Sequence, residues 1–247
     1  MNPIAIDLGF VKVHWYGILV ATAILVGYFI ARYWAVRYGI DGDKFDSLVL
    51  VFVPVIIVGA RVAYVVAAWE YFKDNPAEII RTDHGGLGSH GAILAMLVAG
   101  YVASRVTKMP FWTLADVFGP VLPAAHVFVR LGNFINGELY GLPTTLPWGV
   151  VFPGTTEPHH PSMAYEGLAA IGIFALVWWW AAHRKHEGEV FLKSLLVVSI
   201  VRLLVDFTRP RGPGIIWGLM LTQVLALSLA VLAAVTLLVR SRRAGQA

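Results

Sequence analysis

A twelve-residue stretch, RLGNFINGELYG from Arg130 to Gly141, concentrates polar and flexible residue types directly after an apolar segment. Its three glycines permit tight or left-handed backbone and the close approach of a ligand. The guanidinium of Arg130 can contact phosphate oxygens bidentately, and the carboxamides of Asn133 and Asn136 can both donate to and accept from hydroxyl groups. The stretch therefore predicts a site for a phosphorylated, hydroxylated headgroup, with a purely structural loop as the alternative.

Six ionisable side chains lie within or at the edges of apolar segments, where an ionised group costs about 2.5–3.5 kcal/mol on the membrane-insertion scale. Most such groups face a polar cavity. Arg202 and Asp206 are four residues apart, so they are predicted to meet on one helix face. For Asp206, Glu166 and Arg61 both a structural ion pair and a functional role remain open. The six are Arg61, Arg130, Glu138, Glu166, Arg202 and Asp206.

Two further motifs contain histidine. In HGGLGSHGA, from His84 to Ala92, His90 is predicted to lie inside a helix, either as a packing residue or as a general base. Ser89 beside it lacks a G-x-S-x-G turn, which argues against a serine nucleophile. The adjacent His159 and His160 lack the spacing of a zinc motif, and the chain has no cysteine. We predict neither a metal site nor a cofactor.

A membrane-embedded helical bundle must position these residues. Of the 247 residues, 58% are hydrophobic and 14% are charged, and the mean hydropathy is +0.70. This composition lies outside that of soluble domains, and long apolar runs argue against a transmembrane barrel. The net charge of +4 is spread without a basic run, so we expect membrane lipids as partners and no nucleic acid.

Seven apolar segments are long enough to cross about 30 Å of hydrocarbon as helices. Lysine and arginine are more numerous in the connections that lie on the same side of the membrane as the C-terminus. This excess places the C-terminus in the cytoplasm and the N-terminus outside. We therefore predict an all-α polytopic membrane protein, a single domain over residues 1–247, with outer-face loops at about 70–84 and 130–159. The predicted spans are 13–31, 47–69, 85–104, 111–129, 160–182, 190–207 and 214–239.

The stretch LGNFINGELYG resembles the signature of the prolipoprotein diacylglyceryl transferase family of bacterial membrane enzymes. The resemblance extends over nearly the whole chain through motifs that occur in the same order. They are WYG at 15–17, GAR at 59–61, GGLGSHGA at 85–92, the signature at 130–141, LPWGVVFPG at 146–154, HPS with Tyr165 and Glu166, then Arg202 and Gln223.

The resemblance implies a seven-helix transferase of the bacterial cytoplasmic (inner) membrane with its active site towards the outer leaflet. It implies transfer of the diacylglyceryl group of phosphatidylglycerol to the lipobox cysteine in a prolipoprotein signal peptide, with release of glycerol phosphate. Family roles carry over to Tyr16, His90, Arg130, Asn133, Glu138, Gly141 and Arg202. We predict His90, Arg130, Glu138 and Arg202 as catalytic residues, and Tyr16, Arg61, Asn133, Asn136 and Gly141 as substrate-binding residues.

Within this chemistry, Arg130 and Arg202 are predicted to stabilise the departing phosphate, whose negative charge rises in the transition state. His90 is the natural base for the cysteine thiol by its pKa, and Glu138 is the rival, as a base or as a group that orients an arginine.

The chain departs from the family pattern at three places. Val198 stands where the family usually has a tyrosine, and Leu142 where it often has an arginine. Directly before the signature the family has a short, glycine-rich segment of small residues, where this chain has His126 and the three residues after it. These departures leave a divergent paralogue, acting as a lipid or solute carrier or as an intramembrane hydrolase, as the alternative function.

Overall fold

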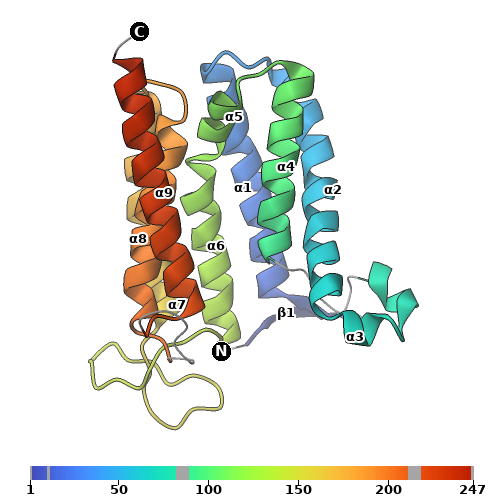
Figure 1. The fold of residues 1–247 in the computed structure, drawn as a ribbon. Helices are drawn as coiled ribbons and strands as arrows, with labels where there is room; N and C mark the ends of the chain where they lie inside the picture. The colour runs from blue at the N-terminus through green and yellow to red at the C-terminus, as the bar shows by residue number, and fades with distance from the viewer. Residues whose placement is uncertain (1, 10–11, 82–88, 211–217, 246–247) are drawn as a thin grey trace. The chain divides into compact units, whose positions relative to one another are not determined.

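The computed structural model describes residues 2–9, 12–81, 89–210 and 218–245, with the backbone alone at 89, 90, 92 and 93. The described chain is mainly helical (Figure 1). It divides into two compact units, Met1–Trp34 with Asp116–Ala247, and Ala35–Ala115. A short β-hairpin precedes the first helix. The elements are β1 (Ile4–Asp7), β2 (Lys12–His14), α1 (Trp15–Arg37), α2 (Gly42–Ala67), α3 (Trp69–Phe72), η1 (Pro76–Ile80), α4 (Ser89–Thr107), α5 (Phe111–Phe118), α6 (Val121–Asn136), α7 (Ser162–Ala182), α8 (Glu189–Asp206) and α9 (Leu221–Ala244).

Five helical stretches in the described chain are long and apolar enough to cross a membrane: α1, α2, the run from Phe111 to Asn136 that holds α5 and α6, α7, and α9. This confirms the prediction of a mainly helical membrane protein. The apolar part of α4 is shorter, and α8 carries charged side chains along its length. Seven spans, the orientation and the single domain stay predictions. Residues 85–88 and 214–217 of the predicted spans lie outside the described residues.

In the first unit, α6 packs against α7, α7 against α8, and α8 against α9. Helix α6 continues through Asn136 and ends at Gly137, which takes left-handed backbone with φ of 70°. Glycine adopts this conformation without a steric cost, so it terminates the helix here. Arg130 and Asn133 therefore project from a helix. The loop predicted to start near residue 130 starts at residue 137 instead, and the loop predicted at about 70–84 contains α3 and η1.

The long connection between α6 and α7 folds back on itself and is tied to the start of α7. The backbone N–H of Gly141 donates to the carbonyl of His160 at 2.7 Å, and Val150 and His159 exchange two backbone hydrogen bonds of 3.0 and 2.9 Å. The indole Nε1–H of Trp148 donates to the hydroxyl of Tyr165 at 2.8 Å. These bonds make the connection an ordered loop beyond the end of α6 (Figure 1).

In the second unit, α2 and α4 run antiparallel and cross at small residues. Gly59 and Ala63 of α2 face Gly91 and Ala95 of α4 closely enough that a Cβ added to either glycine would overlap the opposite helix. Small residues permit such an approach between membrane helices, where van der Waals packing and not hydrophobic burial drives association. The crossing of α2 and α4 therefore depends on the absence of these two side chains.

Substitution of Gly91 by alanine is expected to lower the free energy of unfolding of the purified protein by about 1–3 kcal/mol, as overpacking does. The added Cβ would meet the carbonyl oxygen of Gly59 and the Cβ of Ala63, and neither atom is the end of a flexible side chain. Thermal unfolding in detergent measures the effect. Gly100→Ala is the matched control in the same helix, because its nearest neighbour would be Phe111 at 3.8 Å. Equal stability of the two variants would contradict the prediction.

Candidate functional site

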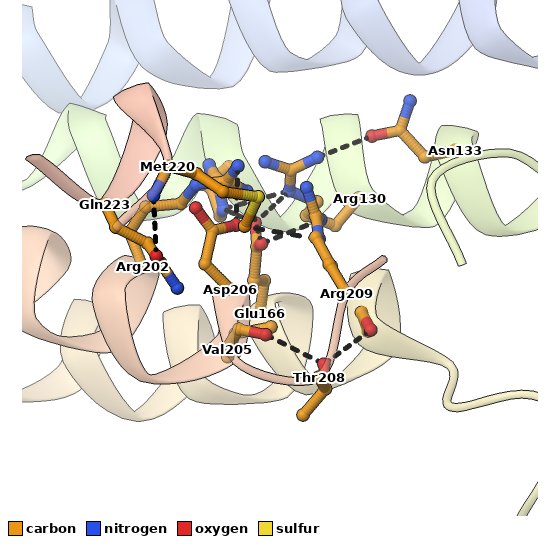
Figure 2. A network of polar contacts seen from close by, with 12 residues as sticks. Arg130, Asn133, Glu166, Arg202, Val205, Asp206, Thr208, Arg209, Met220 and Gln223 are labelled. Carbon is orange, nitrogen blue, oxygen red and sulfur yellow. Dashed lines mark hydrogen bonds and ion pairs between the residues drawn. The ribbon is translucent and has the colours of Figure 1, made fainter. Parts of the chain in front are cut away.

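The first unit contains a buried cluster of ionised side chains centred on Glu166 of α7. This residue lies in the second turn of a helix that begins at Ser162, and it is 2% exposed. A buried carboxylate is stable only where it is paired and hydrogen-bonded. Figure 2 shows that Arg130, Arg202 and Arg209 all point towards it. Three separate segments supply these arginines: α6, α8 and the turn that follows α8.

Each oxygen of the Glu166 carboxylate has two donors close to it. Oε2 lies 2.5 Å from Nε of Arg130 and 3.0 Å from Nε2 of His126. Oε1 lies 2.7 Å from Nη1 of Arg202 and 2.9 Å from Nη2 of Arg209. A carboxylate offers about four lone-pair sites. The carboxylate of Glu166 is therefore saturated, and it fixes the three guanidinium groups relative to one another.

The second carboxylate of the cluster belongs to Asp206. It forms an ion pair of 2.9 Å with Nη2 of Arg202, which confirms the pairing predicted from their spacing. Nε of Arg209 lies further away, at 3.9 Å. Three guanidinium groups thus face two carboxylates, and the cluster holds one positive charge in excess. Such an excess favours the binding of an anion.

Several donors in this region have no acceptor among the described residues. Nε of Arg209 and Nε2 of Gln223 are buried without a hydrogen bond to the described chain, and Nη2 of Arg130 makes none to it either. Burial lowers the pKa of Arg209, and the neighbouring Glu166 carboxylate partly opposes this effect. Because buried donors are normally satisfied, the arrangement suits a ligand that supplies oxygen acceptors and negative charge.

Asn133 connects Arg130 to Glu138. Its Oδ1 accepts from Nη1 of Arg130 at 3.1 Å, and its Nδ2 donates to Oε1 of Glu138 at 2.8 Å. The two partners have opposite charges, so the amide oxygen faces the cationic Arg130 and the amide nitrogen faces the anionic Glu138. Asn136 also directs its amide towards Oε1 of Glu138, at 3.3 Å. The four polar residues that we predicted from the signature are therefore connected through hydrogen bonds that lead from Arg130 to the exposed carboxylate of Glu138.

Two glycines of the signature allow close backbone approach within the same unit. A Cβ on Gly132 would lie 2.8 Å from Cδ2 of Tyr16, so α1 and the predicted substrate-binding Tyr16 pack directly on α6. A Cβ on Gly141 would overlap the carbonyl of Thr208 and lie 2.5 Å from Oγ of Ser162. Because Thr208 precedes Arg209, the position of Gly141 is coupled to that of the third arginine.

Gly141→Ala is expected to lower activity by at least about tenfold and stability by about 1–3 kcal/mol, because no neighbour can yield without moving the turn at Thr208. Initial rates and thermal unfolding measure the two effects. Gly172→Ala is the control, since a Cβ there meets nothing within 4 Å. Wild-type rates for Gly141→Ala would show that the turn tolerates the shift.

The remaining predicted site residues belong to the second unit. Arg61 of α2 donates from Nε to the carbonyl of Ile79 at 2.9 Å and from Nη2 to that of Glu78 at 2.5 Å. Its guanidinium also lies over the rings of Tyr64 and Phe72, at 5.6 and 5.3 Å from their centroids. These contacts tie η1 to α2, and a role in substrate binding stays a prediction.

His90 lies in the first turn of α4, and its side chain lies outside the described part of the structure. Its role as the general base therefore stays a prediction.

Four residues of the cluster are not among the predicted site residues: Glu166, Asp206, Arg209 and His126. For Glu166 and Asp206 the sequence leaves both a structural and a functional role open, and an ionisable residue inside an apolar helix is the signal that could have found them. Arg209 lies in a connection between two helices, where no motif marks it. His126 was noted only as a departure from the family pattern. The contacts of Glu166 with His126 and Arg209 join α7 to α6 and to the turn after α8, and no local spacing reveals them.

Nearly the whole chain is similar to proteins of one family. A protein-family model described as "Prolipoprotein diacylglyceryl transferase" matches residues 3–239. Two similar proteins are each named phosphatidylglycerol–prolipoprotein diacylglyceryl transferase. The one from Bordetella avium (strain 197N) is 35% identical over 84% of this chain and 81% of its own length. The one from Bacillus cytotoxicus (strain DSM 22905 / CIP 110041 / 391-98 / NVH 391-98) is 34% identical over 100% of this chain and 94% of its own.

Proposed function

The chain belongs to the prolipoprotein diacylglyceryl transferase family, and from this premise we propose that it transfers the diacylglyceryl group of phosphatidylglycerol to the lipobox cysteine of prolipoproteins. The products are a thioether and glycerol phosphate. The reaction takes place in the bacterial cytoplasmic (inner) membrane, with the active site towards the outer leaflet. The substrates follow from the names of the relatives, and the arginine cluster of this chain supports them.

The observation that carries the proposal is the convergence of three arginines with one positive charge in excess. Phosphatidylglycerol has an anionic phosphodiester, and its departure as glycerol phosphate increases the negative charge on the phosphate. Fixed cations that face this charge stabilise the transition state more than the bound lipid, which raises the rate. Nη2 of Arg130 and Nε of Arg209 are the donors that we assign to the phosphate oxygens.

In the proposed step, the cysteine sulfur attacks the glyceryl carbon that bears the phosphate. The carbon–sulfur bond forms as the carbon–oxygen bond breaks, and the phosphate leaves with the electron pair. The thiol has an unperturbed pKa near 8.5, so a base must take its proton. His90 remains our candidate for this base. Glu138 is the rival, and its bonds to Asn133 and Asn136 favour the orienting role that we considered for it.

A reconstituted assay tests the proposal directly. Purified protein is incubated with phosphatidylglycerol vesicles and a synthetic peptide that contains a lipobox cysteine, and the peptide is examined by mass spectrometry. The expected product is heavier by one diacylglyceryl unit, and glycerol phosphate accumulates in equal amount. An unchanged peptide mass, with lipid and peptide that a known transferase accepts, would exclude the proposal.

The two alternative functions predict other results in the same preparation. A lipid carrier would move labelled phosphatidylglycerol between leaflets without modifying the peptide. An intramembrane hydrolase that used Ser89 would be labelled by a serine-directed probe. The family membership of the chain favours neither alternative.

A further inference from the structure

Asp206, the last residue of α8, has a buried carboxylate oxygen that the contacts described above leave unused. The residue is 1% exposed. Its Oδ1 lies 2.9 Å from Nη2 of Arg202 and 3.9 Å from Nε of Arg209, so the carboxylate lies between these two guanidinium groups (Figure 2). Its Oδ2 has neither a hydrogen bond nor an ion pair with the described residues. The reaction outlined above assigns no role to this oxygen.

The two carboxylates of the cluster differ in how their oxygens are used. Glu166 is also buried, and each of its oxygens has two nitrogen atoms of neighbouring side chains within 3.0 Å. A buried carboxylate is costly unless its oxygens are paired and hydrogen-bonded. Oδ2 of Asp206 is therefore an acceptor that a bound ligand can satisfy, whereas Glu166 has no such oxygen left.

The unused polar atoms of this region are of two kinds. Nη2 of Arg130, Nε of Arg209 and Nε2 of Gln223 are donors, and the oxygens of a phosphate can accept from them. Oδ2 of Asp206 is an acceptor, and a phosphodiester has no hydrogen to donate to it. A ligand that satisfies both kinds must therefore have a hydrogen-bond donor close to its phosphate.

The headgroup of phosphatidylglycerol has such donors. Nε of Arg209, which we assign to the phosphate, lies only 3.9 Å from the carboxylate of Asp206. The headgroup glycerol is joined to the phosphate through an ester oxygen, and its hydroxyl groups lie on the carbons that follow. Hydrogen bonds from a hydroxyl to a carboxylate are short and charge-assisted. An ammonium headgroup could also donate, but a lipid that carries one has no net charge and would leave the excess positive charge of the cluster unbalanced.

We propose that Asp206 is a specificity-determining residue, whose Oδ2 accepts a hydrogen bond from a headgroup hydroxyl of the lipid substrate. The inference rests on the proposed function for the identity of that lipid. Arg130 and Arg209 bind the phosphate, which many membrane lipids share. Asp206 distinguishes a hydroxylated headgroup from one of the same charge that lacks hydroxyl groups.

A pair of lipids tests the inference on the wild-type protein. Phosphatidylpropanol has the same phosphodiester and the same charge as phosphatidylglycerol, but its headgroup has no hydroxyl. The purified protein in detergent should bind short-chain phosphatidylglycerol at least about tenfold more tightly, because the other lipid leaves Oδ2 buried without a donor. The kcat/KM for transfer should show the same preference. Equal affinities for the two lipids would overturn the inference.

Asp206→Asn tests whether this preference depends on Asp206. The amide keeps the shape of the side chain and an oxygen for Arg202, but it turns an NH2 group to the position of Oδ2. The preference should fall below about threefold, because at most a neutral hydrogen bond replaces a charge-assisted one. The ratio of the two affinities is the readout, since a merely structural loss weakens the binding of both lipids alike.

Glu189→Gln is the matched control, because Glu189 is another buried acid of α8 and pairs with Lys193 at 2.6 Å. It should leave the ratio of the two affinities unchanged. A wild-type ratio in Asp206→Asn would overturn the inference, and if that variant does not fold, the comparison of the two lipids on the wild-type protein still can. Selective binding without peptide modification would overturn the proposed function alone. A wild-type protein that binds neither lipid would overturn both.

Discussion

Arg130→Lys is expected to lower kcat/KM for diacylglyceryl transfer by at least about a hundredfold, because two or more charge-assisted hydrogen bonds are lost. Arg130 bonds to Glu166 through Nε and to Asn133 through Nη1, and Nη2 is left for the substrate. A lysine has one compact ammonium group and cannot span these three directions from one position. The charge is retained, so the loss isolates the geometry of the guanidinium. Steady-state kinetics with phosphatidylglycerol and the lipobox peptide measure it.

The control for this prediction is Arg243→Lys, an exposed residue in the last turn of α9 where the same substitution should have no effect. Thermal unfolding of both variants would show whether the fold is intact. Near-normal turnover of Arg130→Lys would remove Arg130 from the phosphate site. A parallel fall in stability and activity would instead point to a structural role within the cluster.

The sequence predicted the helical segments well because membrane helices are read from long apolar runs, and such runs depend on local composition alone. It also predicted the contact of Arg202 with Asp206, because residues four apart lie on one helix face. The residue at which α6 ends was harder to predict from the sequence. Gly132 and Gly137 both lie in the signature, but only Gly137 takes left-handed backbone, and Gly132 stays helical beside Tyr16. The difference depends on what packs against each glycine.

The residue at the centre of the site, Glu166, was harder to predict than the arginines around it. Arg130 and Arg202 were expected to converge on one anion, and the structure brings both to the carboxylate of Glu166. That Glu166 is the common acceptor follows from the packing of α7 between α6 and α8, which no sequence spacing encodes. Arg209 joins through a turn, where charge alone suggests a solvated residue. Long-range packing thus determines which of several isolated charges form the site.

Glu166→Gln tests whether the carboxylate organises the arginines, and it is expected to abolish detectable transfer and to destabilise the protein by about 3–5 kcal/mol, as the loss of one partner from a buried ion pair does. The amide keeps the shape of the side chain but turns an NH2 group towards donors that need an acceptor. Three guanidinium groups would then face the carboxylate of Asp206 alone. Thermal unfolding in detergent and the transfer assay measure the two effects, and Glu157→Gln on the exposed loop is the control.

A second substitution separates charge balance from catalysis. Removal of Arg209 in the Glu166→Gln background reduces the unpaired positive charge, so the double variant should regain part of the lost stability, and the deviation from additivity measures the coupling of the pair. Activity should not return, because neither Arg130 nor Arg202 regains its acceptor. If Glu166→Gln alone kept wild-type stability and turnover, the arginines would not depend on Glu166. In that case the phosphate site would have to be organised by contacts other than the buried carboxylate.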